Sequence, residues 1–336
     1  MTNSQTRSPG ALPAPIPIPT TISAEAQAML LAMEQIPKQP QPVPEDVEGW
    51  RALVAVAADE SPETVEAVAL VTTASVVTDV AVAVEPREAG GAKYFVATPD
   101  NTATDDDRVL LFIHGGGFTF GAGPVAHRST ELVAGCYGVR TWGMDYRQLP
   151  DDPFPAGLDD CMAVYRQLLT EHRAESIAIA GQSGGANLTA ALLLRARDEG
   201  LPLPAAVGLI SPPADLTQSG DTYQTNGFTI PQGGLTNMAR FYAGGYELDH
   251  PYVSPLFGTY SSDFPPTILT AGTRDFLLSD TVRLHRKLLH AGVRAELHVW
   301  EGAPHGMFMG RAPEDREQVA QVRRFLEDAW SAAARA

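Results

Sequence analysis

The chain has 336 residues, 44% of them hydrophobic, which suffices for one large α/β domain with an accessory element or for two small domains. Its net charge is −16 and no cluster of Lys or Arg stands out, which argues against nucleic acid or an anionic membrane as a partner. We therefore expect a neutral small molecule as the partner, and no nucleic acid.

The cysteines and the N-terminus indicate a reducing compartment. Cys136 and Cys161 show neither metal-ligand spacing nor a disulfide framework, which is typical of buried thiols. The first twenty residues lack the charged and apolar regions of a signal peptide, and no later segment offers the roughly twenty apolar residues of a membrane span. These patterns predict a cytoplasmic protein with no membrane span.

The N-terminal part is predicted to be helical after a disordered start. Four prolines between positions 13 and 19 predict disorder over residues 1–21. Ser23 is a suitable N-cap for a helix that places Ala26 and Leu30 on one face. Two more helices are expected near 45–58 and 62–72, the second with a proline in its first turn.

From about residue 76 the pattern changes to short apolar strands alternating with helices. A strand pair is expected at 76–84 and 93–97, and further strands at 109–113, 139–145, 177–180, 205–210, 267–271 and 295–300. Helices are expected near 155–171, 184–199, 277–291 and 313–334. This alternation predicts a mostly parallel sheet covered on both faces. An insertion at 215–250 would lie at the carboxyl ends of the strands, where such sheets bind ligands.

The segment 181–185 reads Gly-Gln-Ser-Gly-Gly, in the form G-x-S-x-G, between a predicted strand and a predicted helix. This context is typical of a nucleophile elbow, a tight turn that lifts a serine hydroxyl clear of the backbone. A glycine-rich strand-to-helix turn without chemistry would look the same, so Ser183 needs support from other motifs.

A second glycine motif, His114-Gly-Gly-Gly, follows the predicted strand 109–113. Backbone N–H groups can stabilise a tetrahedral oxyanion only where no side chain intervenes, and glycines after the third strand suit that task. A flexible turn or a phosphate loop is the alternative, but no Lys-Ser/Thr pair follows the glycines.

An acid and a base complete the pattern. Asp275 comes just after the strand 267–271, where a carboxylate can orient a histidine; Asp280 is the competing candidate. His305 lies in a Pro-His-Gly loop after the last strand and is the candidate general base. No H-E-x-x-H pair occurs, so no metal is expected. The chain order Ser, Asp, His is that of an α/β-hydrolase.

These motifs resemble the bacterial hormone-sensitive-lipase family of esterases. Residues 145–156, Asp-Tyr-Arg-Gln-Leu-Pro through Pro-Phe-Pro-Ala, are similar to the family segment D-Y-R-L-A-P-E-x-P-F-P-A, and Tyr252-Val-Ser-Pro-Leu also looks like a family segment. The similarity runs from about residue 76 to the C-terminus. The family usually reads G-D-S-A-G-G-N, whereas here Gln182 replaces the acid and Gly184 the alanine.

The resemblance implies an α/β-hydrolase fold whose catalytic domain spans 76–214 and 251–336. It implies a cap formed by N-terminal helices within 22–75 and by the insertion 215–250. It also implies that the amides of Gly116, Gly117 and Gly184 form an oxyanion hole and that no cofactor is needed. A homodimer is possible.

The expected reaction is hydrolysis of short- to medium-chain carboxylic esters by a triad of Ser183, His305 and Asp275, through an acyl-enzyme. Apolar side chains are expected to line the substrate pocket: Phe118, Phe228, Phe241, Met307 and Phe308. Lactones are an alternative substrate. Two alternatives belong to other functional classes: a ligand-binding receptor that resembles plant hormone receptors, and a dehydratase. Such receptors lack the catalytic histidine and such dehydratases lack the serine nucleophile, whereas His305 and Ser183 are both present here.

Overall fold

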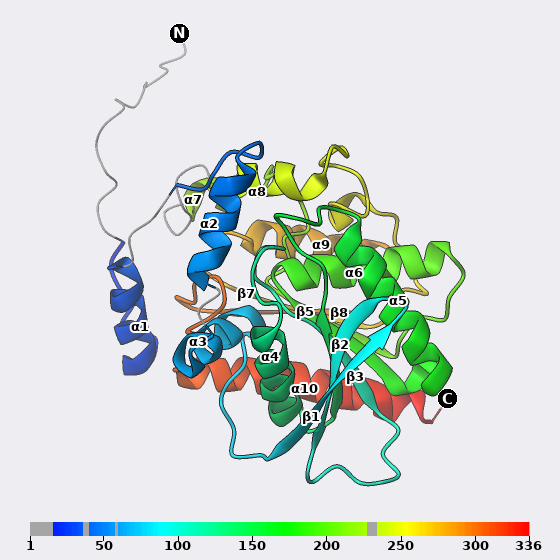
Figure 1. Cartoon of the computed structure of the whole chain (residues 1–336). Helices are drawn as coiled ribbons and strands as arrows, with labels where there is room; N and C mark the ends of the chain where they lie inside the picture. Colours follow the sequence, from blue (N-terminus) through cyan, green and yellow to red (C-terminus); the bar gives the residue numbers. More distant parts are fainter. Residues whose placement is uncertain (1–15, 36–39, 58–59, 227–233, 336) are drawn as a thin grey trace, which may run out of the picture.

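The computed structural model describes residues 16–35, 40–57, 60–226 and 234–335. Its centre is an eight-stranded sheet in the order β1-β2-β4-β3-β5-β6-β7-β8 (Figure 1). The strands are β1 (Val82–Ala89), β2 (Ala92–Pro99), β3 (Val109–Ile113), β4 (Arg140–Asp145), β5 (Ile177–Gln182), β6 (Ala206–Ile210), β7 (Thr267–Gly272) and β8 (Ala295–Trp300). Strand β2 pairs antiparallel with both β1 and β4, and the remaining pairs are parallel. The predicted fold class is confirmed.

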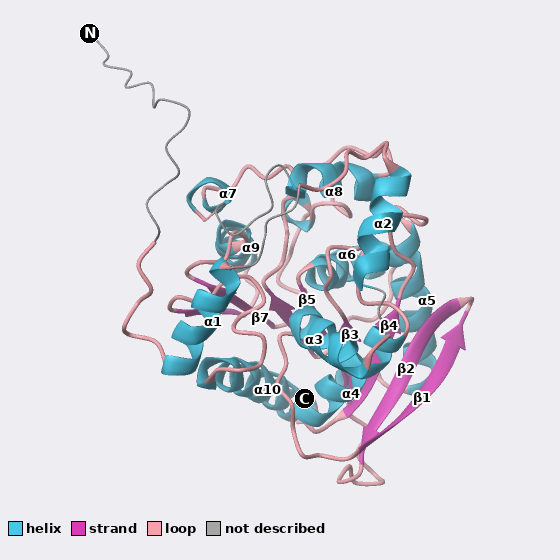
Figure 2. Cartoon of the chain, turned by 60° about the vertical axis from the view of Figure 1, so that its left-hand side comes forward, coloured by secondary structure: helices cyan, strands magenta, loops and turns pink. Residues whose placement is uncertain are grey.

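Helices cover both faces of this sheet, because side chains alternate from one face to the other along each strand. On one face, Leu111 and Ile179 pack against helices α5 (Ala156–Glu171), α6 (Gly184–Asp198) and α9 (Leu278–His290). On the other, Phe112 and Ala180 pack against α4 (Pro124–Tyr137) and α10 (Pro313–Ala333). Figure 2 shows these two layers on either side of the magenta strands. Helix α4 was not predicted.

The first strand begins later than predicted. The pattern placed it at 76–84, whereas β1 starts at Val82. Val76 is instead buried in the core beside α4, and its carbonyl accepts a hydrogen bond from the Cys136 thiol. Val76 therefore contributes to the packing of α4 rather than to the sheet.

The three N-terminal helices lie in three different places. Helix α3 (Pro62–Thr73) packs on α4 through Leu70. Helix α2 (Val47–Ala57) lies beside α8 (Gly234–Ala243) of the insertion, with the rings of Trp50 and Phe241 5.4 Å apart. A short helix, α7 (Thr222–Thr225), precedes α8 in the insertion.

Helix α1 (Ala24–Glu34) docks far from α2, on the C-terminal part of the chain (Figure 2). Its N-cap Ser23 donates two hydrogen bonds of 2.8 Å to the carboxylate of Glu314. The segment before it was predicted to be disordered, and two residues of its described part, residues 16–21, contact the rest of the chain. Arg274 donates to the Pro17 carbonyl at 2.5 Å, and Ile18 packs with α1. Residues 1–15 lie outside the described residues.

In the part of the chain that the structure describes, no helix is both long and apolar enough to cross a membrane.

Candidate active site

Ser183 lies in a sharp turn between β5 and α6. Its backbone φ is +51°, a left-handed value that is uncommon for a residue with a side chain. The turn closes only with glycine on both sides. A Cβ at Gly181 would lie 2.4 Å from the Gly185 carbonyl oxygen, and one at Gly185 would lie 2.0 Å from the Ile113 carbonyl oxygen. The local geometry is therefore that of a nucleophile elbow.

The glycine loop after β3 lies directly beside this turn. Gly116 has a φ of +106°, and a Cβ there would lie 2.1 Å from the Phe120 carbonyl oxygen, so only glycine fits. The Gly115 amide donates to the Thr72 carbonyl at 2.7 Å, which ties the loop to α3. Gly116, Gly117 and Gly184 all line one cavity together with Ser183.

His114 holds the loop in place. It is fully buried, its ring stacks on Tyr146 with centroids 4.6 Å apart, and its Nδ1–H donates to the Gly115 carbonyl at 2.7 Å. The Tyr146 hydroxyl donates to the His114 carbonyl at 3.0 Å. Burial lowers the pKa of His114 to about 4, so its imidazole is neutral at neutral pH. This histidine is a structural support for the glycines.

Ser183, His305 and Asp275 meet at the carboxyl ends of their strands. The distance from His305 Nε2 to Ser183 Oγ is 2.9 Å. On the other side of the ring, Nδ1 lies 3.2 Å and 3.3 Å from the two carboxylate oxygens of Asp275. The three side chains thus lie in the hydrogen-bond order that a nucleophile, a base and an orienting acid require.

Asp275 is completely buried and still favours its charged form. Burial raises the pKa of the carboxyl, but the adjacent His305 and hydrogen bonds from His305, Ser211 and the Leu277 amide together hold it below its usual value. Asn226 of the insertion donates from its side-chain amide to the Asp275 carbonyl at 3.0 Å. The acid is therefore fixed both by its own turn and by the insertion.

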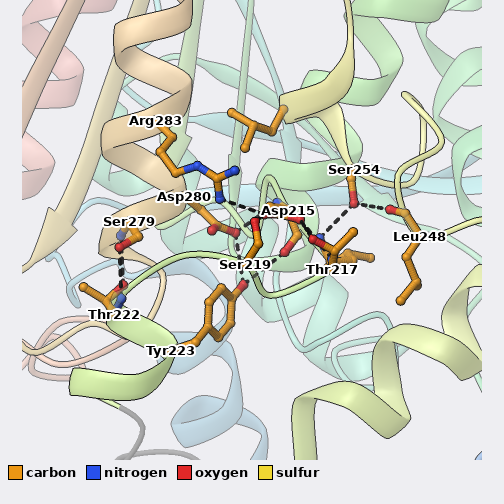
Figure 3. Close-up of polar contacts among 12 residues, drawn as sticks. Asp215, Thr217, Ser219, Thr222, Tyr223, Leu248, Ser254, Ser279, Asp280 and Arg283 are labelled. Carbon is orange, nitrogen blue, oxygen red and sulfur yellow. Dashed lines mark hydrogen bonds and ion pairs between the residues drawn. The ribbon is translucent and has the colours of Figure 1, made fainter. Parts of the chain in front are cut away.

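Asp280, the competing candidate for the acid, has other partners than His305 among the described residues. Its Oδ2 accepts hydrogen bonds of 3.0 Å from the Asp215 amide and from the Tyr223 hydroxyl (Figure 3). Asp215 in turn pairs with Arg283 at 2.7 Å and accepts from two hydroxyl groups of the insertion. Burial raises the pKa of Asp280 to about 8. This carboxyl joins the base of the insertion to α9 and takes no part in the site.

An apolar cavity of about 200 Å³ opens above Ser183. Its described walls contain no Asp, Glu, Lys or Arg side chain, and Phe118 and Phe120 lie on the side of the glycine loop. The insertion supplies the opposite wall, through Leu216, Tyr223, Leu235, Met238 and Ala239. A neutral, mostly apolar ligand fits these walls.

Three of the residues predicted to line the cavity lie outside its wall, so that prediction is corrected for them. Phe241 faces Trp50 of α2, outside the described cavity wall. Met307 and Phe308 turn away from the site and form a small core with α1. Phe118 does line the cavity, and Phe228 lies outside the described residues.

Several cavity residues were not predicted. Met238 and Leu235 lie in the insertion that was expected to bind ligand, so their helical spacing was a usable signal. Gln41 reaches the cavity from the segment before α2, and no local pattern in the sequence marks it.

Among the described residues, no group of three or more His, Cys, Asp or Glu side chains is arranged to hold a metal ion.

Comparison with known proteins agrees with this geometry. A family model described as alpha/beta hydrolase fold matches residues 110–309. An acetyl-hydrolase of Streptomyces hygroscopicus is 33% identical over 234 residues, covering 68% of this chain and 78% of the relative. An esterase of Acinetobacter venetianus is 29% identical over 228 residues, covering 65% and 74%.

Two solved structures extend the similarity over almost the whole chain. Esterase E25 has a TM-score of 0.81 and 34% identity, covering 97% of this chain and 98% of that one. An esterase from the bacterial hormone-sensitive lipase family has a TM-score of 0.73 and 28% identity, covering 92% and 99%.

Proposed function

The chain belongs to the alpha/beta hydrolase fold family and, within it, to the bacterial hormone-sensitive-lipase esterases, and from that premise we propose that it cleaves short-chain carboxylic esters with Ser183, His305 and Asp275. The observation that carries the proposal is the 2.9 Å contact between Ser183 Oγ and His305 Nε2, with a buried carboxylate behind the imidazole. This arrangement supports ester hydrolysis as the activity of the chain.

The proposed reaction has two steps. Ser183 Oγ attacks the ester carbonyl carbon while its proton passes to His305 Nε2, and Asp275 stabilises the imidazolium. The amides of Gly116, Gly117 and Gly184 stabilise the oxyanion. The C–O bond to the alcohol then breaks, and the alcohol leaves with the proton from His305. Water, activated by the same histidine, attacks the acyl-enzyme to release the carboxylic acid and free Ser183.

The cavity supports a preference for short acyl chains. Its volume of about 200 Å³ lies below the ~300–1,000 Å³ range of common ligand pockets. We assign the cap to α2 and the insertion 215–250, because these segments pack on each other and the insertion forms one cavity wall. Long acyl chains would have to displace Met238 or Leu235.

The test is hydrolysis of p-nitrophenyl esters from acetate to dodecanoate by the wild type and by Ser183→Ala. We expect turnover to peak at short chains and to fall by at least ~10³-fold in the variant. Ser262→Ala removes the hydroxyl of an exposed serine outside the site and is the matched control, with full activity expected. Equal activity of Ser183→Ala and wild type on every ester would overturn the proposal.

We also propose that two copies pair along β8. This strand ends the sheet order, so its outer edge has no partner strand in the described chain, and Val299 on it is 42% exposed. Light scattering is expected to give twice the mass of one chain, and Val299→Lys to return the mass to that of a monomer. A monomeric wild type would contradict this pairing.

A further inference from the structure

One buried serine beside the triad has no part in the two-step reaction proposed above. Ser211 directly follows strand β6 and is only 3% exposed. It does not belong to the described wall of the cavity, so a substrate bound there does not touch it. Its backbone φ is +48°, close to the +51° of Ser183, and such values are uncommon for residues with a side chain.

The backbone around Ser211 joins two strands of the site. A glycine would adopt this φ without strain, whereas a residue with a Cβ adopts it only where the surrounding structure fixes the chain. The Ser183 amide donates to the Ile210 carbonyl at 2.8 Å. On the other side, the Ser211 amide donates to the Thr270 carbonyl at 2.8 Å. The end of β6 is thus tied both to the nucleophile after β5 and to β7, the strand that precedes the acid.

The side chain of Ser211 reaches the acid of the triad. Its hydroxyl donates a hydrogen bond to the carboxylate of Asp275, which is fully buried. The same carboxylate accepts from the Leu277 amide at 2.9 Å and lies 3.2 Å and 3.3 Å from His305 Nδ1. Three segments of the chain therefore each direct one donor at this buried anion, and hydrogen bonds to a charged acceptor are strong.

The hydroxyl restrains the carboxylate and also stabilises its charge. A carboxylate that is held by donors on several sides keeps its orientation toward the imidazole, and each donor weakens its attraction for the proton of an imidazolium. Tyr223 of α7 also lies near Asp275, but burial and the charges of nearby carboxylates, Asp280 first, raise the pKa of its hydroxyl well above its usual value. Tyr223 therefore stays neutral, and the charge of Asp275 acts mainly on His305.

We propose that Ser211 is a positioning residue of the reaction, whose hydroxyl holds the carboxylate of Asp275 in the orientation that His305 requires. This inference rests on the proposed ester hydrolysis and adds a fourth side chain behind the triad. Ser211 acts through Asp275 and touches neither the substrate nor the reacting atoms.

The experiment removes the hydroxyl in two ways. Ser211→Ala keeps the Cβ, whereas Ser211→Gly also relieves the positive φ, so it keeps the test open if the alanine variant folds poorly. Ser211→Thr retains the hydroxyl and is the conservative rescue, although a branched side chain is disfavoured at this φ. The values of kcat and KM for p-nitrophenyl butyrate are measured over the whole pH range in which wild type is active.

Both variants without the hydroxyl should lower kcat by ~5-fold or more and leave KM within ~2-fold, because the acid is less well oriented while the cavity wall is unchanged. The acid limb of the kcat/KM profile should move to higher pH by ~0.5 unit, since a carboxylate with fewer donors holds the imidazolium more strongly. Ser211→Thr should keep the acid limb of wild type. The position of this limb does not depend on how much of a variant is folded.

Ser176→Ala is the matched control. Ser176 is also buried, and its hydroxyl donates to the carboxylate of Asp107 at 2.7 Å, but it directly precedes β5, at the end of that strand opposite to Ser183. The loss of this hydrogen bond removes a buried hydroxyl from a carboxylate outside the site. It should leave kcat, KM and the acid limb unchanged.

An acid limb that stays in place in both Ser211→Ala and Ser211→Gly would overturn the inference, and so would a shift of the same size in Ser211→Thr or Ser176→Ala. Failure of the proposed hydrolysis gives a different result. In that case wild type would hydrolyse no ester, or Ser183→Ala would be as active as wild type, and the inference would fall together with the proposed function.

Discussion

Replacing Asp280 with asparagine is expected to remove a pH-dependent loss of stability. The carboxyl is buried, and its pKa rises from 3.8 in the unfolded chain to about 8 in the folded one. The folded state therefore holds a proton that the unfolded state releases between these pH values, and the free energy of unfolding falls as pH rises through this window. Below pH 3.8 the stabilising contribution is complete, and near pH 8 it is lost.

The size of the effect follows from the shift. At about 1.4 kcal/mol per pKa unit, the loss is roughly 2 kcal/mol by pH 5 and roughly 6 kcal/mol by pH 8. The amide side chain introduced by Asp280→Asn would still accept from the Asp215 amide and the Tyr223 hydroxyl, and it cannot ionise. The difference in unfolding free energy between Asp280→Asn and wild type should therefore grow by about 4 kcal/mol from pH 5 to pH 8.

The assay is urea unfolding of both proteins at several pH values. Asp280→Leu serves as the control, because it is neutral but accepts no hydrogen bond. Its stability should run parallel to that of Asp280→Asn at every pH and stay below it. Parallel curves for wild type and Asp280→Asn between pH 5 and pH 8 would refute the reasoning.

Three further substitutions test other parts of the structure. Asp275→Asn should lower kcat by ~10³–10⁴-fold, because the imidazole would lose its orienting carboxylate, while circular dichroism of the folded protein stays the same. Met238→Ala should widen the cavity and move the preferred p-nitrophenyl ester to a longer chain, and Met238→Trp should move the preference to a shorter chain. An identical chain-length profile in the two variants would contradict the place of Met238 in the cavity wall. Phe308→Ala should cost about 3–5 kcal/mol of stability in thermal or urea unfolding, since this fully buried ring joins α1 to the loop that carries His305. A loss below about 1 kcal/mol would show that the ring is not part of a packed core.

Most of the sheet and the proposed catalytic residues follow from local patterns in the sequence. The runs at 109–113 and 177–180 are short, apolar and flanked by glycine motifs, and these features predict both the strands and the turns after them. Helix α4 escaped prediction because glycines precede it and its buried face includes small residues such as Ala126 and Gly135, so that apolar periodicity is weak.

The cavity wall depends on contacts between distant segments, which local patterns do not encode. Phe308 follows His305 closely, yet it packs on α1, an element nearly three hundred residues earlier in the chain. Phe241 and Met238 lie on the same helix, but only the position of α2 decides which of them faces the cavity. Gln41 could be found only from the folded structure, because its role depends on where α2 docks.

The docking of α1 has a consequence for how the protein is made. Ser23 and its partner Glu314 are separated by 291 positions, so α1 leaves the ribosome long before the segment on which it packs. Until α10 has emerged, Ser23 lacks the carboxylate of Glu314, and the loop that follows His305 lacks the hydrogen bond from the Phe308 amide to Asp315. A nascent chain that stops short of α10 and a chain that lacks α1 would therefore share one defect, a histidine loop without part of its packing.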